Sequence, residues 1–384
     1  MDRFRMLPSY HYEDNTDGSL LKSVGKPLRD YRIEGNCFQD GVPSPENPIE
    51  VQCCGEKTVN MIDYTKIPSR TARGITFTNN NDGTFTANGK LTAVTLRYLL
   101  KDGLDLDSFV SGETYYASCG VDYNDGVRRY YLMVQIQNSQ TGAMRYYASN
   151  GINTTFSLTE NESVSVVDVR INSPTGELFE VQDLVFSPII CKASEYVDFE
   201  PYGYKVPVTV SNDSGEKTYN IYLNEPLRKV GDCADYIDFK SGKVMRHNVV
   251  VDLSGYKWYC QYVNDTENFY YITNAPTPIF SSVYCLCNCA KRTPIGTTNS
   301  YLGIEVYESK IIRFRPDMTV YGTLEKWQDY IDNNECYVIY PLGEPQEQPI
   351  SLPKILTEKG TNIISVGTTL QPSTVNYQYY KGGK

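Results

Sequence analysis

The sequence has few of the residues and motifs on which common enzyme chemistries depend. Only two histidines, His11 and His247, occur among its 384 residues. A multi-histidine metal centre or a histidine-assisted nucleophile therefore has little to draw on. The chain also lacks the G-x-S-x-G turn, the G-x-x-x-x-G-K-[ST] loop and the G-x-G-x-x-G fingerprint. These absences argue against acyl transfer and nucleotide binding.

Long apolar runs and an excess of basic residues are also missing. No stretch approaches the roughly 18 consecutive apolar residues that would indicate a membrane-spanning helix, and residues 1–12 contain no apolar core of the signal-peptide type. Lys and Arg number 36 against 46 Asp and Glu, which gives a net charge of −10. We therefore expect synthesis in a cytoplasm, no membrane insertion and no nucleic-acid partner.

The cysteines do not follow a metal-binding or disulfide pattern. There are 11 of them, an odd number, and no C-x-x-C occurs, so we expect reduced thiols and not a disulfide framework. Cys285, Cys287 and Cys289 would share one face of a strand. Without a second pair at zinc spacing, we expect a buried or interfacial strand there and no metal site. No cofactor is expected.

The sequence does contain many tyrosines and clear period-two patterning. It has 33 Tyr against 13 Phe and 2 Trp. Ile75 and Phe77 precede an Asn-rich turn, and Phe85 and Ala87 follow it, which predicts a hairpin. Further strands are predicted at Tyr115–Cys119, Arg129–Gln137, Phe156–Leu158, Val164–Ile171, Leu184–Ile189, Val206–Val210, Tyr219–Leu223, Tyr236–Phe239, Lys243–Arg246 and Cys336–Tyr340. Short strands of this kind indicate a mainly β fold built of antiparallel β-sandwich modules.

Changes in this pattern divide the chain into three parts. Residues 1–55 read as an N-terminal connector or attachment segment, because the turn-rich text before residue 55 offers little core. Residues 56–200 read as a β-sandwich. Residues 201–384 read as a mostly β domain with one helix near 323–332, where Leu324, Trp327 and Ile331 recur at spacings of three and four.

Paired tyrosines within the middle strands suggest a binding surface. In a strand, each pair places one ring on each side of the sheet. Tyrosine rings with amides and an arginine suit a sugar, which needs a flat apolar surface under its C–H face and polar groups around its hydroxyls. The predicted glycan-binding residues are Tyr116, Tyr131, Gln135, Arg145 and Tyr147. The alternatives are a solvated sheet face and a subunit interface.

Acidic residues offer a competing, catalytic interpretation. Two carboxylates about 5 to 9.5 Å apart could hydrolyse a glycosidic bond. Glu113, Asp122 and Asp125 are candidates, but they lie in turn-like text beside glycines, where Asp is favoured for local hydrogen bonding. We therefore expect no catalytic residues and no enzymatic activity.

A phrase near the N-terminus resembles a known group of proteins. Gly35–Val51 reads GNCFQDGVPSPENPIEV, which is similar to the G-N-x-x-Q-D-G-x-P-x-P-x-N-P-x-E-I phrase of tail, baseplate and fibre-associated structural proteins from phages and prophages of Gram-positive gut bacteria. Further passages with the same resemblance are Asn60–Asp63, Phe199–Gly203, Glu225–Gly231, Asp235–Phe239, Tyr340–Pro345 and Gln371–Thr374.

The resemblance implies a non-enzymatic virion structural protein whose middle part, residues 56–200, is similar to jelly-roll carbohydrate-binding modules. It implies assembly as an oligomer, with a trimer favoured, alongside other virion proteins in a tail, baseplate or fibre. A host cell-surface polysaccharide is a further candidate partner. The chain would be made in the host cytoplasm and located in the virion.

Three alternatives remain open at this stage. The first is a capsid-attached fibre or decoration protein, which differs in its place on the particle. The second is a glycan depolymerase tailspike, which would need a cleft with two carboxylates and would release reducing sugar. The third is a bacterial surface adhesin, which would carry export and wall-anchoring signals.

Overall fold

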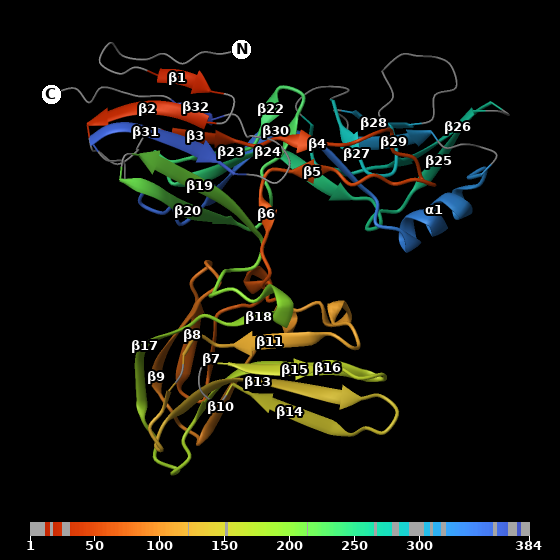
Figure 1. The fold of residues 1–384 in the computed structure, drawn as a ribbon. Coiled ribbons are helices and arrows are strands. Elements are labelled where there is room, and N and C mark those ends of the chain that lie inside the picture. The colour runs from red at the N-terminus through yellow and green to blue at the C-terminus, as the bar shows by residue number, and fades with distance from the viewer. Residues whose placement is uncertain are drawn as a thin grey trace. The chain divides into compact units, whose positions relative to one another are not determined.

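The fold is mainly β, with antiparallel sheets in sandwich-like arrangements, as the sequence predicts (Figure 1). A computed structural model describes residues 12–15, 18–24, 31–121, 123–149, 153–212, 214–264, 267–278, 284–291, 303–307, 310–315, 320–355, 359–367 and 375–377. These residues contain one α-helix. None of their helices is long and apolar enough to cross a bilayer.

The chain divides into two compact units. Unit 1 comprises Met1–Glu56, Val206–Ile221 and Pro226–Lys384, and unit 2 comprises Lys57–Lys205 and Tyr222–Glu225. The sequence boundaries at 55/56 and 200/201 stand close to the changes between units at 56/57 and 205/206. The N-terminal segment belongs to the same unit as the C-terminal residues.

Unit 2 contains three antiparallel sheets. The four-stranded sheet has the order β17 (Glu180–Phe186), β9 (Phe85–Lys90), β8 (Ile75–Asn79), β7 (Arg70–Ala72). The five-stranded sheet has the order β10 (Thr95–Leu99), β16 (Glu162–Asn172), β13 (Arg129–Asn138), β12 (Tyr123–Asn124), with β14 (Met144–Ala148) also paired to β13. The three-stranded sheet has the order β15 (Thr154–Ser157), β11 (Thr114–Ser118), β18 (Ile189–Lys192). Four 3₁₀ turns join these strands: η1 (Tyr64–Lys66), η2 (Lys101–Gly103), η3 (Leu106–Ser108) and η4 (Ala193–Glu195).

The predicted hairpin is confirmed as β8 and β9. Ile75, Phe77 and Phe85 are buried and alternate with more exposed threonines, so one face of the hairpin enters the core. Between the strands, Asn81 and Gly83 have φ values of 60° and 89°. Asn and Gly tolerate this left-handed conformation, which explains why they occur in this turn.

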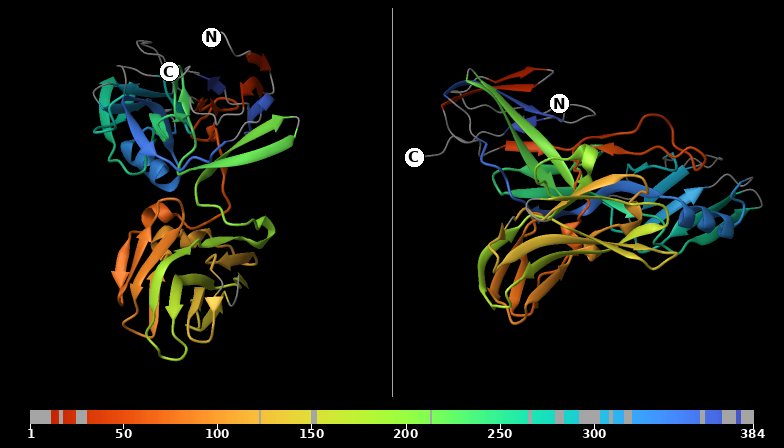
Figure 2. Two further views of the ribbon diagram at one scale, coloured as in Figure 1. Left: turned by 90° about the vertical axis from the view of Figure 1, so that its left-hand side faces the viewer. Right: turned by 60° about the horizontal axis from the view of Figure 1, so that its bottom comes forward.

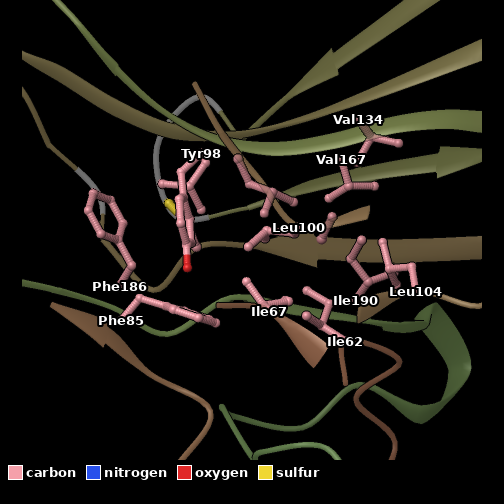
Figure 3. Packing of buried hydrophobic residues seen from close by; sticks show 14 of the residues in the cluster. Ile62, Ile67, Phe85, Tyr98, Leu100, Leu104, Val134, Val167, Phe186 and Ile190 are labelled. Atoms are coloured by element: carbon pink, nitrogen blue, oxygen red, sulfur yellow. The ribbon is translucent and has the colours of Figure 1, made fainter. Parts of the chain in front are cut away.

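One core, to which all three sheets of unit 2 contribute, holds the sandwich together (Figure 3). The Tyr98 ring stacks on Phe77 with centroids 4.3 Å apart, and Phe85 packs edge-on to Tyr98 at 5.4 Å. The Tyr98 hydroxyl donates to the carbonyl of Pro68 at 3.0 Å. A buried tyrosine is stable here because its polar tip finds a partner at the margin of the core.

Unit 1 is built from five groups of paired strands. One sheet has the order β1 (Tyr12–Asn15), β2 (Gly18–Val24), β31 (Lys359–Val366), β19 (Tyr204–Asn212), β20 (Gly215–Leu223). A second has the order β27 (Leu286–Cys287), β30 (Tyr337–Pro349), β24 (Lys243–Asp252), β23 (Tyr236–Asp238), β3 (Tyr31–Glu34), β32 (Val375–Tyr377). The others are β25 (Tyr259–Asn264), β26 (Glu267–Ile272), β29 (Ile311–Arg315) and β28 (Gly303–Tyr307); β21 (Lys229–Val230) with β22 (Cys233–Ala234); and β4 (Cys37–Phe38) with β5 (Gln52–Cys53). Strand β6 (Glu56–Lys57) lies where the chain passes from unit 1 to unit 2.

The predicted helix is confirmed as α1 (Leu324–Asn333). It begins at Thr323, whose side chain accepts a hydrogen bond from the Lys326 amide. Trp327 is fully buried, and its ring stacks on Phe314 of β29 at 3.8 Å. In Figure 2 the helix, in blue, lies beside the teal strands of the β25–β28 sheet.

One predicted strand is divided in the structure. The sequence suggests a continuous strand over Leu184–Ile189, but β17 ends at Phe186 and β18 begins at Ile189. Pro188 lies between them and has no amide hydrogen to donate to a ladder. The break allows the chain to move from the four-stranded sheet to the three-stranded sheet.

Candidate functional site

The five predicted glycan-binding residues do not share one face. In the β13–β14 pairing, Ile136 stands opposite Arg145 and Val134 stands opposite Tyr147. Directly opposed residues of an antiparallel pair point to the same side of the sheet. Arg145 and Tyr147 therefore lie on the core side with the buried Val134 and Ile136.

Tyr116 lies on a different sheet from the other four. It is part of β11, between β15 and β18. Its ring is buried beside Ile189 and Cys191 and lies 4.3 Å from the ring of Tyr196. Its partner in the sequence, Tyr115, enters the main core. The expectation of one ring on each side is thus confirmed for this pair, but Tyr116 does not extend the surface formed by β13.

Arg145 and Tyr147 form a structural contact at the edge of the sandwich. Arg145 Nη1 donates to the Tyr147 hydroxyl at 2.6 Å, and its Nε donates to Glu162 Oε1 at 2.8 Å. The Tyr147 ring lies 6.0 Å from Phe156 in the core. The hydrogen bond from Arg145, with that from the Thr159 amide, lowers the pKa of Glu162 to about 2. These groups hold the β14 edge strand in place.

The remaining two predicted residues, Tyr131 and Gln135, lie on the outer face of the five-stranded sheet. The register places Tyr131 opposite Arg170, and Arg170 opposite Arg97 of β10. Asp168 of β16 lies on this same outer face, two residues from Arg170. We call the group Arg97, Arg129, Tyr131, Asp168 and Arg170 the arginine face.

A buried carboxylate organises the arginine face. Asp168 is fully buried and accepts a hydrogen bond from Arg97 Nε at 2.7 Å and another from Arg170 Nε at 2.6 Å. Burial opposes the charge of Arg170, but the hydrogen bond and charge of Asp168 raise its pKa above the usual value. The two hydrogen bonds hold both guanidinium groups in fixed positions.

The aromatic ring of Tyr131 lies beside these cations. Its side chain is only 6% exposed, and the guanidinium carbon of Arg129 lies 4.4 Å from its ring centroid. The arginine face thus combines three guanidinium groups with one carboxylate. Its local charge is positive, although the whole chain has a net charge of −10.

Next to the arginine face, the outer face of the sheet carries uncharged side chains. Met133 lies opposite Asp168 on one side and Ala148 on the other, and Gln135 lies opposite Tyr146. Gln135 Nε2 is 3.4 Å from the sulfur of Met144. Tyr146 is 56% exposed, so its ring is available to a ligand. The outer tyrosine of β14 is therefore Tyr146, not the predicted Tyr147.

Arg97, Asp168 and Arg170 are not among the residues predicted from the sequence, although strand β16 contains a signal for two of them. In β16 the apolar Val167, Val169 and Ile171 alternate with Asp168 and Arg170. That alternation predicts a polar outer face for β16. Sequence alone does not show that Arg97, 71 residues from Asp168, reaches the same carboxylate.

The carboxylates considered for catalysis do not form a described pair. Asp125 caps a local turn, since its Oδ1 accepts hydrogen bonds from the amides of Val127 and Arg128. Glu113 is half-buried and lies just before β11. Asp122 lies outside the described residues.

The histidine and cysteine candidates are packed side chains. The His247 ring stacks on Tyr236 at 5.5 Å, and His11 lies outside the described residues. Cys285, Cys287 and Cys289 are all buried in the core of unit 1, although only Leu286 and Cys287 belong to a strand. Within the described parts of the chain, no three His, Cys, Asp or Glu side chains gather as a metal site.

Residues of the Gly35–Val51 passage make hydrogen bonds that hold this segment in unit 1. In unit 1, Gln39 Nε2 donates to the carbonyls of Ile49 and Cys287 at 2.8 and 2.9 Å. The Tyr330 hydroxyl donates to the carbonyl of Pro45 at 2.9 Å, and the Tyr337 hydroxyl accepts from the Val51 amide. The segment 38–52, which we call the strap, is thereby fastened to the unit by side chains far from it in sequence.

A second resembling passage surrounds the buried Asp235. Its Oδ1 accepts hydrogen bonds from the His247 amide at 2.8 Å and the Asn248 amide at 2.9 Å. Its Oδ2 accepts from the Arg228 amide at 3.2 Å and from Arg246 Nη1 at 3.4 Å. This carboxylate joins the passages Glu225–Gly231 and Asp235–Phe239 to strand β24.

Two further passages tie the ends of unit 2 together. Asn60 Nδ2 donates to the carbonyls of Pro188 and Glu200 at 3.1 and 3.0 Å. Glu200 in turn accepts a hydrogen bond from the Val59 amide at 2.7 Å. The passage Gln371–Thr374 lies outside the described residues.

Comparison with known proteins adds no family to these observations. No family model, no curated protein and no solved structure matches the chain.

Proposed function

We propose that the chain is a non-enzymatic structural protein of a phage particle, located in a tail, baseplate or fibre. The observation that carries this proposal is that the passages similar to phage structural proteins hold segments of the chain together. Gln39 and Asn60 each join segments far apart in the sequence by hydrogen bonds to buried or half-buried groups. The buried Asp235 carboxylate fastens neighbouring segments to strand β24. Residues in such roles maintain a scaffold, and the resemblance to phage structural proteins supplies the kind of assembly.

Locating the chain in purified particles tests this proposal. Cryo-electron microscopy of phage made in cells that express the chain should place it in the tail, baseplate or fibre, with more than one copy in contact. The chain's presence on the capsid would favour the capsid-attached alternative. Its absence from particles, together with its presence on the wall of the producing bacterium, would contradict the proposal and favour an adhesin.

Mass measurement of the purified chain tests the expected self-association. We expect an oligomer, with a trimer favoured, since modest apolar content is compensated when subunits bury surface between them. A strict monomer at high concentration would count against this part of the proposal.

Within that role, we propose that unit 2 binds an acidic polysaccharide of the host surface through the arginine face. Arginine forks match carboxylate and phosphate groups in two parallel hydrogen bonds. Asp168 fixes two of these forks in advance, so less side-chain freedom is lost on binding. The exposed ring of Tyr146 provides the flat apolar surface that the C–H face of a sugar needs.

Binding measurements with the full chain test the glycan proposal. Titration with acidic and neutral envelope polysaccharides should give binding to the acidic ones, weakened by added salt. Arg97→Gln should reduce the affinity by roughly tenfold to a hundredfold, the value of a hydrogen bond to a charged group. Tyr146→Ala should also weaken binding, because it removes the exposed ring. Tyr146 is 56% exposed and the Arg97 side chain is 45% exposed, so neither substitution removes a core side chain.

Two surface variants provide matched controls. Arg70 lies on an exposed position of β7, and Tyr196 is 48% exposed beside the three-stranded sheet. Arg70→Gln and Tyr196→Ala remove the same chemical groups from other surfaces of unit 2 and should leave binding unchanged. Equal loss in the controls, or binding to no polysaccharide, would contradict the assignment. Release of reducing sugar would favour a depolymerase.

A further inference from the structure

A pair of cysteines faces each other across the strands that bracket the strap. Cys37 of β4 stands directly opposite Cys53 of β5 in an antiparallel pairing. Their sulfur atoms are 2.9 Å apart, and both residues are half-buried. Both are free thiols in the structure.

The pairing geometry is suitable for a covalent link. The Cys54 amide donates to the carbonyl of Asn36 at 3.0 Å, so the neighbouring pair Asn36–Cys54 occupies a hydrogen-bonded position. Hydrogen-bonded and non-hydrogen-bonded pairs alternate along an antiparallel ladder, which puts Cys37 and Cys53 at a non-hydrogen-bonded position. The Cα atoms of such a pair are about 4.5 Å apart, inside the range of about 4.4 to 6.8 Å that disulfides require.

The surroundings of the two sulfur atoms differ in a way that assigns their roles. The backbone amide of Lys229 points at Cys37 Sγ, 3.3 Å away. The hydrogen bond from Cys53 is the main cause of a lowered pKa at Cys37, with the Lys229 amide and Arg228 adding to it. The same hydrogen bond, together with burial, raises the pKa of Cys53. Cys37 is therefore the better nucleophile, and Cys53 keeps its proton.

We propose that Cys37 and Cys53 are an oxidation site that closes to a disulfide when the protein meets a low-molecular-weight disulfide, such as the oxidised glutathione class. The Cys37 thiolate attacks one sulfur of that disulfide and releases one small thiolate. Cys53 then loses its proton and attacks the Cys37 sulfur of the mixed disulfide, which releases the second small thiolate. Two protein thiols are oxidised and one small disulfide is reduced to two thiols.

The link would close the strap into a covalent loop at its two ends. The 15 residues between the two cysteines include Gln39 and Val51, which fasten the strap through their contacts with Cys287 and Tyr337. A disulfide removes freedom from the unfolded chain, and to a greater degree when it closes a longer loop. The reduced protein is thus suited to a cytoplasm, and the oxidised protein to service outside it.

Peptide mapping of the full chain tests the proposal. The purified protein is treated with oxidised glutathione, its remaining thiols are alkylated, and it is digested without reductant by a protease that cleaves after Glu. Cleavage after Glu34, Glu46, Glu50 and Glu56 separates residues 35–46, which contain Cys37, from residues 51–56, which contain Cys53 and Cys54. We expect these two peptides to be joined, with a mass two hydrogens below their sum.

Variants identify the sulfur atoms involved. Cys37→Ser and Cys53→Ser should each abolish the joined peptide, whereas Cys54→Ala should retain it. The oxidised wild-type protein should also melt roughly 6 to 12 °C above the reduced protein, a difference that is absent in Cys37→Ser. This second readout does not depend on digestion.

Three results would overturn the proposal. The first is full alkylation of Cys37 and Cys53 after oxidation. The second is a joined peptide that Cys54→Ala abolishes, because this would assign the link to the wrong neighbour. The third is a glutathione adduct that persists on Cys37 without closure, because this would show that Cys53 cannot reach it.

Discussion

At the residue scale, Arg145 is predicted from the sequence to bind a ligand, but in the structure it stabilises the fold through its pairing with Glu162. Arg145 contacts Glu162, the Tyr147 hydroxyl and the carbonyl of Ser157. It therefore joins β14 to the ends of β15 and β16. A sugar would have to displace these contacts to reach the guanidinium group, so we assign Arg145 to stability.

This pair predicts a pH dependence of stability. The folded protein lowers the pKa of Glu162 from 4.5 to about 2, so its stabilising effect is fully present above pH 4.5 and is lost as the pH falls toward 2. Glu162→Gln should lower the free energy of unfolding by about 1 kcal/mol at pH 7, since the partly exposed Arg145 limits the effect.

Denaturant unfolding followed by near-ultraviolet circular dichroism at several pH values checks this prediction. The difference between wild type and Glu162→Gln should shrink steadily between pH 5 and pH 2. Glu160→Gln, a change at an exposed position two residues away, should have little effect throughout. A difference that does not depend on pH would show that the charge of Glu162 is not what stabilises β14.

At the element scale, the sequence predicts which strands exist better than it predicts how they pair. The alternation of Tyr130, Leu132, Val134 and Ile136 identifies the buried face of β13 correctly, because burial leaves a local period-two record. The side to which Tyr146 and Tyr147 point depends on the β13–β14 register, and a shift of one residue exchanges them. That register is fixed by the turn between the strands and by the Arg145 contacts, which no local pattern records.

The helix α1 is an element whose start signal can be tested directly. Thr323 accepts a hydrogen bond from the Lys326 amide and occupies the N-cap position. Thr323→Ala should destabilise unit 1 by about 1 kcal/mol, whereas Thr323→Ser keeps the hydroxyl and should restore most of the loss. Tryptophan fluorescence during urea unfolding reports the effect, because Trp327 lies within α1. Equal stability of the Ala and Ser variants would contradict the capping role.

At the scale of the whole molecule, the two units have separate hydrophobic cores. The core of unit 2 contains Phe77 and Tyr98, and the core of unit 1 contains Trp258 and Trp327. These two are the only tryptophans in the sequence. Tryptophan fluorescence therefore reports unit 1 alone, while tyrosine and peptide signals report both units.

Separate cores predict separable unfolding. Phe77→Ala should destabilise unit 2 by about 3 to 5 kcal/mol through the cavity that it leaves and should shift part of the circular dichroism transition. It should leave the midpoint of the tryptophan transition unchanged. Phe314→Ala, which removes the ring stacked on Trp327, should do the reverse. Movement of the tryptophan midpoint by Phe77→Ala would show that the units unfold as one.

The pairing of β2 with β31 has a consequence for synthesis on the ribosome. Residues 19–24 pair with residues 359–364, so the first of these strands must wait until translation has passed residue 364. Unit 2 ends at Glu225. All of its residues have therefore left the exit tunnel of the ribosome well before residue 364 is translated. We therefore expect unit 2 to fold before β2 pairs with β31.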